Sequence, residues 1–199
     1  MRIESATFVS SAGGLTECPT DPRVEIALSG RSNVGKSSLL NSLVGRRELA
    51  KVANTPGKTR RLNYFLVNDS FHVVDLPGYG YASASGAARN AWSEMMQGYL
   101  RKRRQLVGVI QLVDARHVPS SEDREMICWL RDERMSFCLA ATKVDKLGPS
   151  KRAPALRVIA RDLELVEAQP IVAYSSHTGE GRPALLAWIG HTLDALASS

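Results

Sequence analysis

Eight residues near the start of the chain have the types and spacing of a phosphate-binding loop. They read Gly-Arg-Ser-Asn-Val-Gly-Lys-Ser over residues 30–37 and fit the pattern Gly-x4-Gly-Lys-Ser. Glycines let successive main-chain N–H groups turn toward an oxyanion, and the positive end of the following helix attracts it. Lys36, a candidate catalytic residue, would reach the β- and γ-phosphates, and the Ser37 hydroxyl would bind Mg²⁺. We expect nucleotide contacts from Gly30, Arg31, Ser32, Asn33, Val34, Gly35, Lys36, Ser37 and Ser38.

A second motif, Asp75-Leu76-Pro77-Gly78, follows a hydrophobic stretch. The Asp75 carboxylate can hold Mg²⁺ through a water molecule, and the Gly78 N–H can sense a γ-phosphate, which makes Gly78 a candidate catalytic residue. Turns of this kind often close strands, so the motif gains its weight from the phosphate-binding loop upstream. We expect Asp75, Leu76, Pro77 and Gly78 to line the nucleotide site.

A third motif, Thr142-Lys143-Val144-Asp145, predicts guanine as the base. The Asp145 carboxylate can accept hydrogen bonds from both N1–H and the 2-amino group of guanine, whereas adenine has an acceptor at N1 and nothing at C2. Because charge-assisted hydrogen bonds contribute about 1.5 to 3 kcal/mol each, the discrimination would be strong. The stem of Lys143 would pack across the base. Further contacts are expected from Tyr174, Ser175 and Ser176, where a main-chain N–H suits the guanine O6 atom.

The hydrophobic pattern predicts the scaffold that brings these motifs together. Strand-like apolar runs alternate with amphipathic helical stretches, which is typical of an α/β fold. We expect a mostly parallel six-stranded sheet with one antiparallel strand and helices on both faces. Ligands bind at the carboxyl ends of strands in such sheets, and the motifs fall there. The expected strands are 24–29, 62–67, 71–75, 107–113, 136–142 and 171–174, and the expected helices are 37–45, 88–104, 122–134, 150–167 and 183–197.

Length and composition favour one globular domain. The chain has 199 residues, of which 44% are hydrophobic, and we assign residues 1–22 to an N-terminal extension and residues 23–197 to a single nucleotide-binding domain. A net charge of +6 favours contact with a polyanion such as nucleic acid. No apolar run approaches the roughly 20 residues of a membrane-spanning helix, and no signal peptide is visible. We therefore expect a cytoplasmic monomer without membrane contact.

The cysteines predict neither a disulfide framework nor a zinc site. Cys18, Cys128 and Cys138 are odd in number and far apart, and the sequence has no Cys-x-x-Cys spacing. Cys128 and Cys138 each lie in an apolar segment, so we expect both in the core.

Together the motifs resemble translation-factor-type P-loop GTPases, and more narrowly the EngB/YsxC (YihA) family. The resemblance is carried by Gly-Arg-Ser-Asn-Val-Gly-Lys-Ser-Ser-Leu-Leu-Asn from residue 30 and Asp-Leu-Pro-Gly-Tyr-Gly-Tyr-Ala from residue 75, and extends from about Phe8 to about Trp188. That family is associated with assembly of the large ribosomal subunit in bacteria, and with cell division and septation. The resemblance implies GTP and GDP as ligands, GTP hydrolysis with Mg²⁺, and the ribosomal RNA and proteins of that subunit as partners.

The resemblance also locates a threonine of the first mobile loop. The family pattern Thr-Pro-Gly-x-Thr matches residues 55–59, which implies that Thr59 closes over Mg²⁺ and the γ-phosphate as a third candidate catalytic residue. Lys58, Arg60 and Arg61 lie beside it and are also candidates for contact with an RNA backbone. A second basic cluster, residues 101–104, ends a helix, where solvated cations are favoured. The nucleotide contacts implied in this loop are Gly57, Lys58, Thr59, Arg60 and Arg61.

Tyr79 occupies the position at which Ras-like enzymes have a water-orienting glutamine. Because a phenol is a poor replacement, we expect slow intrinsic hydrolysis that a partner or an ion stimulates. The side-chain carbonyl of Asn33 is a candidate K⁺ ligand, since GTPases with a similar Asn-Val-Gly-Lys-Ser run include potassium-activated members. Stabilisation of the loop is the alternative role for Asn33.

Two functions stay open at this point. The first is a GTP-driven assembly factor for the large ribosomal subunit, and the alternative is an accessory regulatory GTPase of an RNA-modifying system. The alternative requires a companion catalytic domain or subunit. A small-molecule kinase would leave the motif at residues 142–145 without a purpose.

Overall fold

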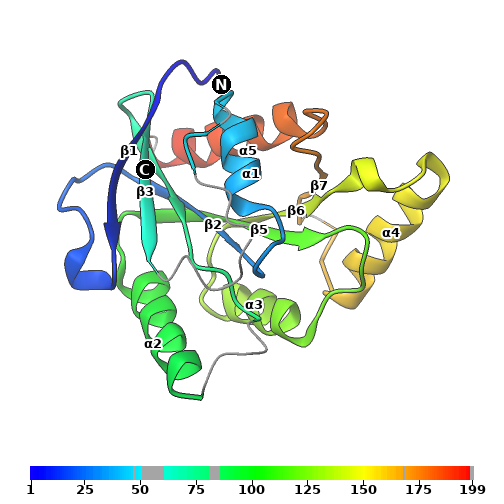
Figure 1. Ribbon diagram of the computed structural model, residues 1–199, viewed down its shortest axis with the longest axis horizontal. Helices are drawn as coiled ribbons and strands as arrows, with labels where there is room; N and C mark the ends of the chain where they lie inside the picture. The colour runs from blue at the N-terminus through cyan, green and yellow to red at the C-terminus, as the bar shows by residue number, and fades with distance from the viewer. Residues whose placement is uncertain (47, 51–60, 81–85, 168, 198–199) are drawn as a thin grey trace.

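The computed structural model describes residues 1–46, 48–50, 61–80, 86–167 and 169–197, which form three layers around one sheet (Figure 1). Within these ranges the sheet has seven strands in the order β1-β3-β4-β2-β5-β6-β7. β3 is antiparallel to both of its neighbours and the other neighbouring pairs are parallel, which confirms the predicted α/β class with one antiparallel strand. The strands are β1 (Ala6–Ala12), β2 (Glu25–Gly30), β3 (Leu62–Val67), β4 (Phe71–Asp75), β5 (Leu106–Asp114), β6 (Phe137–Thr142) and β7 (Ile171–Ala173).

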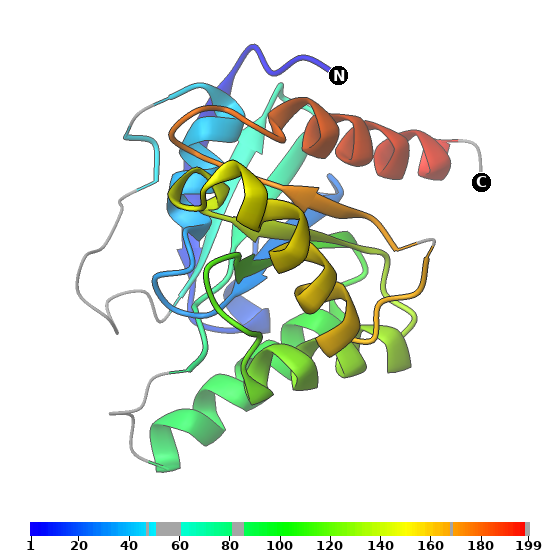
Figure 2. The same cartoon turned by 90° about the vertical axis from the view of Figure 1, so that its right-hand side faces the viewer.

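Helices cover both faces of the sheet, as predicted (Figure 2). On one face α1 and α5 bury leucine and isoleucine side chains against the sheet, and on the other face α2, α3 and α4 do the same. No helix in the described ranges is long and apolar enough to cross a membrane. The helices are α1 (Lys36–Val44), α2 (Gly86–Lys102), α3 (Ser121–Asp132), α4 (Pro149–Asp162) and α5 (Arg182–Ala197), with short 3-10 turns η1 (Leu15–Glu17) and η2 (Val144–Lys146).

The first strand corrects the predicted strand number. The sequence predicts six strands and none before residue 24, whereas β1 pairs antiparallel with β3 and makes the sheet seven-stranded. Ala6 and Ala12 are buried at the ends of β1, while Phe8 and Val9 are exposed. The register also shifts between Phe8 and Ser10, which is the sign of a β-bulge. An edge strand with this burial pattern lacks the regular alternation that sequence analysis detects.

The burial of two side chains, Cys128 and Arg103, differs from the prediction. Cys128 is exposed, because the buried positions of α3 are Asp123, Ile127 and Leu130 and Cys128 lies off that stripe; Cys138 is buried as predicted. Arg103 was expected to be solvated at a helix end. Its side chain is only 10% exposed, because it pairs with Glu25, a buried residue at the start of β2.

Candidate nucleotide-binding site

The predicted motifs meet at the carboxyl edge of the sheet, where β2, β4, β6 and β7 end. Two contacts join motifs that are far apart in the sequence. The Thr142 hydroxyl donates a hydrogen bond to the Val34 carbonyl (2.8 Å), and the Ser32 N–H donates to the Tyr79 carbonyl (2.9 Å). The phosphate-binding loop is therefore held between the second and third motifs.

The loop geometry leaves the N-terminus of α1 open to an anion. Gly35, the residue before α1, adopts a left-handed conformation (φ 113°), and no side chain in the described ranges caps this helix. The first N–H groups of a helix have no partner within the helix, so an uncapped end favours negative charge. Gly30 allows close packing, because a Cβ atom there would lie 2.8 Å from the Leu112 carbonyl oxygen.

Lys36, the first residue of α1, is buried within the loop. Its Nζ atom donates hydrogen bonds to the main-chain carbonyls of Gly30 (3.0 Å) and Arg31 (3.2 Å). Burial lowers the pKa of its ammonium group, and the nearby Asp75 carboxylate opposes that shift. The loop thus holds the Lys36 ammonium group against two of its main-chain carbonyls, and this positive charge suits a polyphosphate.

Ser37 and Asp75 fit a hard divalent cation such as Mg²⁺. The Ser37 hydroxyl donates to Asp75 Oδ2 at 3.0 Å, while Asp75 Oδ1 is buried and has no hydrogen-bond partner in the described part of the chain. Burial raises the pKa of Asp75, with Lys36 and Ser37 acting in the opposite direction. A buried carboxylate oxygen without a donor is costly, and Mg²⁺ prefers oxygen ligands, so a hydrated Mg²⁺ suits this pair.

Gly78 lies close enough to the loop that no other residue type fits. A Cβ atom at this position would be 2.8 Å from the Ser32 nitrogen and 2.9 Å from Lys36 Nζ. The structure therefore places the main chain of the second motif directly beside the two groups of the first that are predicted to bind phosphate. The two residues before Gly78 in the motif, Leu76 and Pro77, connect Asp75 to this contact.

The third motif reaches both the loop and the last strand. Lys143 Nζ donates to the Asn33 carbonyl (2.7 Å) and to Asp114 (2.9 Å), and both Asn33 and Lys143 have φ of 62°. Asp145 Oδ1 accepts a hydrogen bond from the Ser175 hydroxyl at 2.7 Å. That bond lowers the pKa of Asp145 and keeps it a carboxylate at neutral pH. An ionised acceptor, oriented by a serine, suits the two N–H donors of guanine.

Two of the remaining predicted residues, Tyr174 and Arg61, have side chains that point away from the three motifs. The Tyr174 side chain is fully buried on the α1 side of the sheet, and its hydroxyl donates to Ser42 at 3.1 Å. Arg61 lies at the start of β3 and pairs with Glu17 at 2.6 Å. Ser176 is half-buried next to Ser175. Residues 57–60, including Thr59, lie outside the described ranges.

Sequence reasoning missed three polar residues that hold the predicted ones. Asp114 binds Lys143 and Arg116, and although burial opposes it, these hydrogen bonds lower the pKa of Asp114. Gln111 and Asp123 hold the Tyr79 hydroxyl. Gln111 was visible as a polar residue within an apolar strand, and Asp123 as the last residue of a Ser-x-x-Asp helix start.

Comparison with known proteins agrees with the resemblance. A family model described as 50S ribosome-binding GTPase matches residues 25–143. A probable GTP-binding protein EngB of Pelotomaculum thermopropionicum is 48% identical over 190 residues, which cover 96% of each chain. A protein of the same description from Chlorobium luteolum is 46% identical over 198 residues, covering 100% of this chain and 95% of the relative.

Solved structures show the same fold. The crystal structure of a probable GTP-binding protein engB has a TM-score of 0.72 at 19% identity and covers 86% of this chain and 100% of that one. Era, in complex with MgGDPNP and nucleotides 1506–1542 of 16S ribosomal RNA, has a TM-score of 0.63 at 20% identity, covering 83% of this chain and 55% of Era. With its motifs, its fold and close relatives along nearly its whole length, the chain belongs to the EngB family of P-loop GTP-binding proteins.

Proposed function

We propose that this protein binds GTP with Mg²⁺, hydrolyses it to GDP and phosphate, and uses the difference between the two states to control assembly of the large ribosomal subunit. The observation that carries the proposal is the meeting of Lys36, the Ser37–Asp75 pair and the Ser175–Asp145 pair at one sheet edge. Each would bind a different part of the ligand: the phosphates, the cation and the base. The ribosomal part is supported by the description of the matching family model.

The proposed chemistry assigns a role to each of these groups. Lys36 and the N–H groups of residues 33–38 bind the β- and γ-phosphates, and the Gly78 N–H binds the γ-phosphate. Ser37 and Thr59 would hold the Mg²⁺, Asp75 would hold it through water, and the ion would offset phosphate charge. Tyr79 is buried with its hydroxyl bonded to Asp123 and Gln111, so it is not free to orient a water molecule. This supports slow intrinsic hydrolysis that a partner stimulates.

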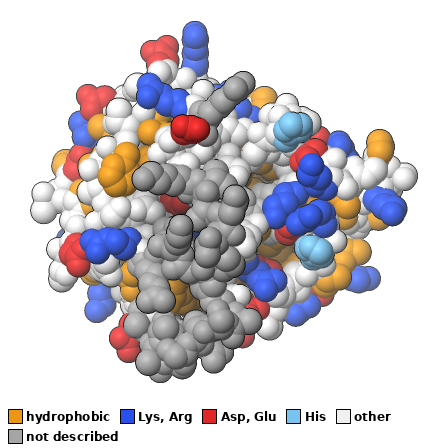
Figure 3. Space-filling view, viewed as in Figure 1, with side chains coloured by type: hydrophobic (Ala, Val, Ile, Leu, Met, Phe, Trp, Pro, Cys, Tyr) orange, Lys and Arg blue, Asp and Glu red, His pale blue; other side chains and the backbone are white. Residues whose placement is uncertain are grey.

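A polyanionic partner fits the surface around the site. A cavity of about 240 Å³ opens beside the phosphate-binding loop, and its lining includes the basic residues Arg31, Arg116, His117 and Lys143 together with the acidic residues Asp114 and Asp123. Figure 3 shows Lys, Arg and His side chains gathered on one side of this face of the molecule. An RNA backbone suits such a surface, and salt would weaken the contact.

Potassium stimulation is a second part of the proposal. Asn33 is exposed in the loop, and its main-chain carbonyl accepts a hydrogen bond from Lys143, so its side-chain oxygen is the candidate ligand for the cation. We expect faster turnover in KCl than in NaCl at matched ionic strength, and an Asn33→Ala variant that has lost the difference. Equal rates in the two salts would rule the ion out.

Sedimentation with purified large subunits tests the main proposal. We expect the protein, a cytoplasmic monomer on this proposal, to pellet with large subunits or their precursors in a non-hydrolysable GTP analogue and not in GDP or an ATP analogue. Binding to an RNA-modifying enzyme and not to the subunit would favour the alternative function. If the protein does bind the large subunit, a link to cell division and septation would follow from the ribosome supply of the cell.

A further inference from the structure

The hydroxyl of Tyr79 makes two hydrogen bonds in the core. It donates to Asp123 Oδ1 of α3 at 2.7 Å and accepts from Gln111 Nε2 of β5 at 2.6 Å. Asp123 and Gln111 are both buried, and Tyr79 itself is 5% exposed. The phenol is therefore anchored to two elements that do not belong to the nucleotide motifs.

The main chain of the same residue holds the phosphate-binding loop. The Tyr79 carbonyl accepts from the Ser32 N–H at 2.9 Å, and Tyr79 forms an isolated parallel bridge with Arg31. Gly78, one residue earlier, is the position at which a Cβ atom would collide with Ser32 and Lys36. Whatever fixes Tyr79 therefore fixes the Gly78 N–H relative to the loop.

Asp123, which accepts a hydrogen bond from the Tyr79 hydroxyl, is itself held in place. Asp123 Oδ2 accepts from the N–H (2.9 Å) and the hydroxyl (3.0 Å) of Ser120, which completes a capping box at the start of α3. On its other side the Tyr79 ring packs edge to face on Trp92 of α2, with ring centroids 6.0 Å apart. The Trp92 indole N–H donates to the Pro77 carbonyl at 3.2 Å. Residues 77–79 are thus held from β5, α2 and α3 at once.

We propose that the Tyr79 hydroxyl is a positioning group that sets how tightly GTP binds relative to GDP. Resting on the proposed function, the inference is that the Tyr79–Asp123 bond keeps the Gly78 N–H where a γ-phosphate meets it. Only a triphosphate uses that N–H, so a loss of positioning weakens GTP binding and leaves GDP binding in place. Pre-organised donors are effective because they need no rearrangement when the charge arrives.

The test compares two buried tyrosines. Tyr79→Phe removes one hydroxyl bonded to a buried carboxylate, and Tyr99→Phe removes the other, which donates to Glu25 at 2.7 Å. The dissociation constants of GDP and of a non-hydrolysable GTP analogue are measured for both variants and for the wild type. We expect Tyr79→Phe to weaken the analogue about tenfold and GDP less than twofold. Tyr99→Phe should lower thermal stability and leave the ratio of the two constants unchanged.

A second pair of variants keeps the test decisive if Tyr79→Phe does not fold. Asp123→Ala removes the acceptor of the Tyr79 hydroxyl together with the cap, whereas Ser120→Ala weakens the same cap and leaves Asp123 Oδ1 in place. We expect a changed ratio for Asp123→Ala and an unchanged ratio for Ser120→Ala. Where Tyr79→Phe does fold, combining it with Asp123→Ala should cause no further change.

The outcomes separate this inference from the proposed function. An equal loss of GDP and analogue affinity in Tyr79→Phe, or an unchanged ratio in both Tyr79→Phe and Asp123→Ala, would overturn the positioning role while GTP binding stands. A wild-type protein that binds neither GDP nor the GTP analogue would overturn the proposed function itself.

Discussion

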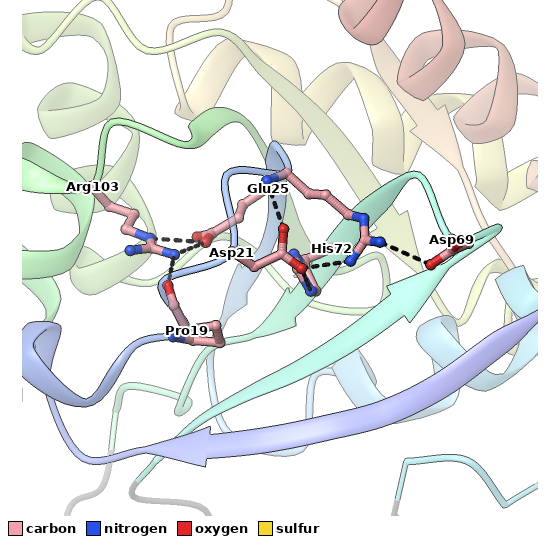
Figure 4. A network of polar contacts seen from close by, with 7 residues as sticks. Pro19, Asp21, Glu25, Asp69, His72 and Arg103 are labelled. Carbon is pink, nitrogen blue, oxygen red and sulfur yellow. Dashed lines mark hydrogen bonds and ion pairs between the residues drawn. The ribbon is translucent and has the colours of Figure 1, made fainter.

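Two buried carboxylates at opposite edges of the sheet have opposite surroundings. Glu25 starts β2, and its oxygens accept hydrogen bonds from Arg103 and from the Tyr99 hydroxyl, while Arg103 also binds the Pro19 carbonyl (Figure 4). Asp75 ends β4, accepts from Ser37 on one oxygen, and has no described partner on the other. A carboxylate that the protein satisfies internally stabilises the fold, and one that it leaves half-satisfied suits a ligand.

The residues around the two carboxylates differ less than the carboxylates themselves. At the Glu25 edge, Asp21, Arg23 and Asp69 form a chain of ion pairs that joins the segment before β2 to the turn between β3 and β4 (Figure 4). The Ser32 hydroxyl at the Asp75 edge and both ring nitrogens of His72 at the Glu25 edge are buried without a hydrogen-bond partner among the described residues, so the contrast rests on the carboxylates. We therefore expect variants at the first edge to change stability and variants at the second edge to change ligand binding.

The largest effect is expected for Arg103→Ala. Its loss leaves the Glu25 carboxylate buried without a cation, which costs about 3 kcal/mol of the free energy of unfolding, measured in urea. The GTP dissociation constant should not change. Arg101→Ala, two residues earlier in the last turn of α2, is the matched control, because Arg101 pairs with Glu133 at the surface and its loss should cost less than about 1 kcal/mol. Similar losses in both variants would contradict the contrast between the two edges.

Asp145→Asn should change the base preference without unfolding the protein. An amide donates where the carboxylate accepted, so GTP affinity should fall about a hundredfold while xanthosine triphosphate, which carries a carbonyl at C2, gains. Calorimetry with the two nucleotides measures both changes. A variant that still prefers GTP would show that Asp145 does not bind the base.

Asp75→Asn and Glu25→Gln compare the two carboxylates directly. Asp75→Asn removes a carboxylate whose pKa is already raised by burial, so the free energy of unfolding should change by no more than about 1 kcal/mol. The Mg²⁺ dependence of GTP-analogue binding should disappear. Glu25→Gln should instead lower stability, since it leaves Arg103 without its partner, and keep the Mg²⁺ dependence. The opposite pattern would reverse the assignment of the two edges.

The smallest effect concerns His72, which lies beside the Glu25 network. Burial lowers the pKa of His72, with Asp21 and Glu25 opposing and Arg23 and Arg103 supporting the shift. Its folded pKa is therefore below the unfolded value of about 6.5, and the unfolded state binds more protons between the two. Stability should fall as the pH drops below about 6.5. His72→Phe keeps the edge-to-face contact with Tyr64 and should lose less stability than the wild type between pH 7.5 and 5.5.

The elements with regular patterns were predictable from the sequence. β3 and β4 have the predicted bounds, because two short apolar runs joined by the polar turn Asn68-Asp69-Ser70 define a hairpin locally. α4 ends at Asp162, five residues before its predicted end. Leu165 N–H bonds to the Ala160 carbonyl and Glu164 adopts φ of 50°, so the helix closes through a left-handed residue that is not glycine.

The meeting of the three motifs at one sheet edge was predictable, because the residues of each motif follow one another in the chain. The three motifs have fixed spacing, and the sheet brings them to one edge. Partners such as Gln111 and Asp123, which lie 32 and 44 positions from Tyr79, depend on packing between elements and leave no local pattern. The same holds for β1, whose partner β3 begins 50 residues after β1 ends.

That distance has a consequence for the order in which the chain folds during synthesis. β1 leaves the ribosome first, but its hydrogen-bonding partner is complete only when Val67 has been added, 55 residues after Ala12. At 5–20 residues per second, the first strand is without its partner for about 3 to 11 s. Its exposed Phe8 and Val9 are the side chains that a chaperone or a second nascent chain would meet in that interval, and the bulge at this point makes such mispairing less favourable.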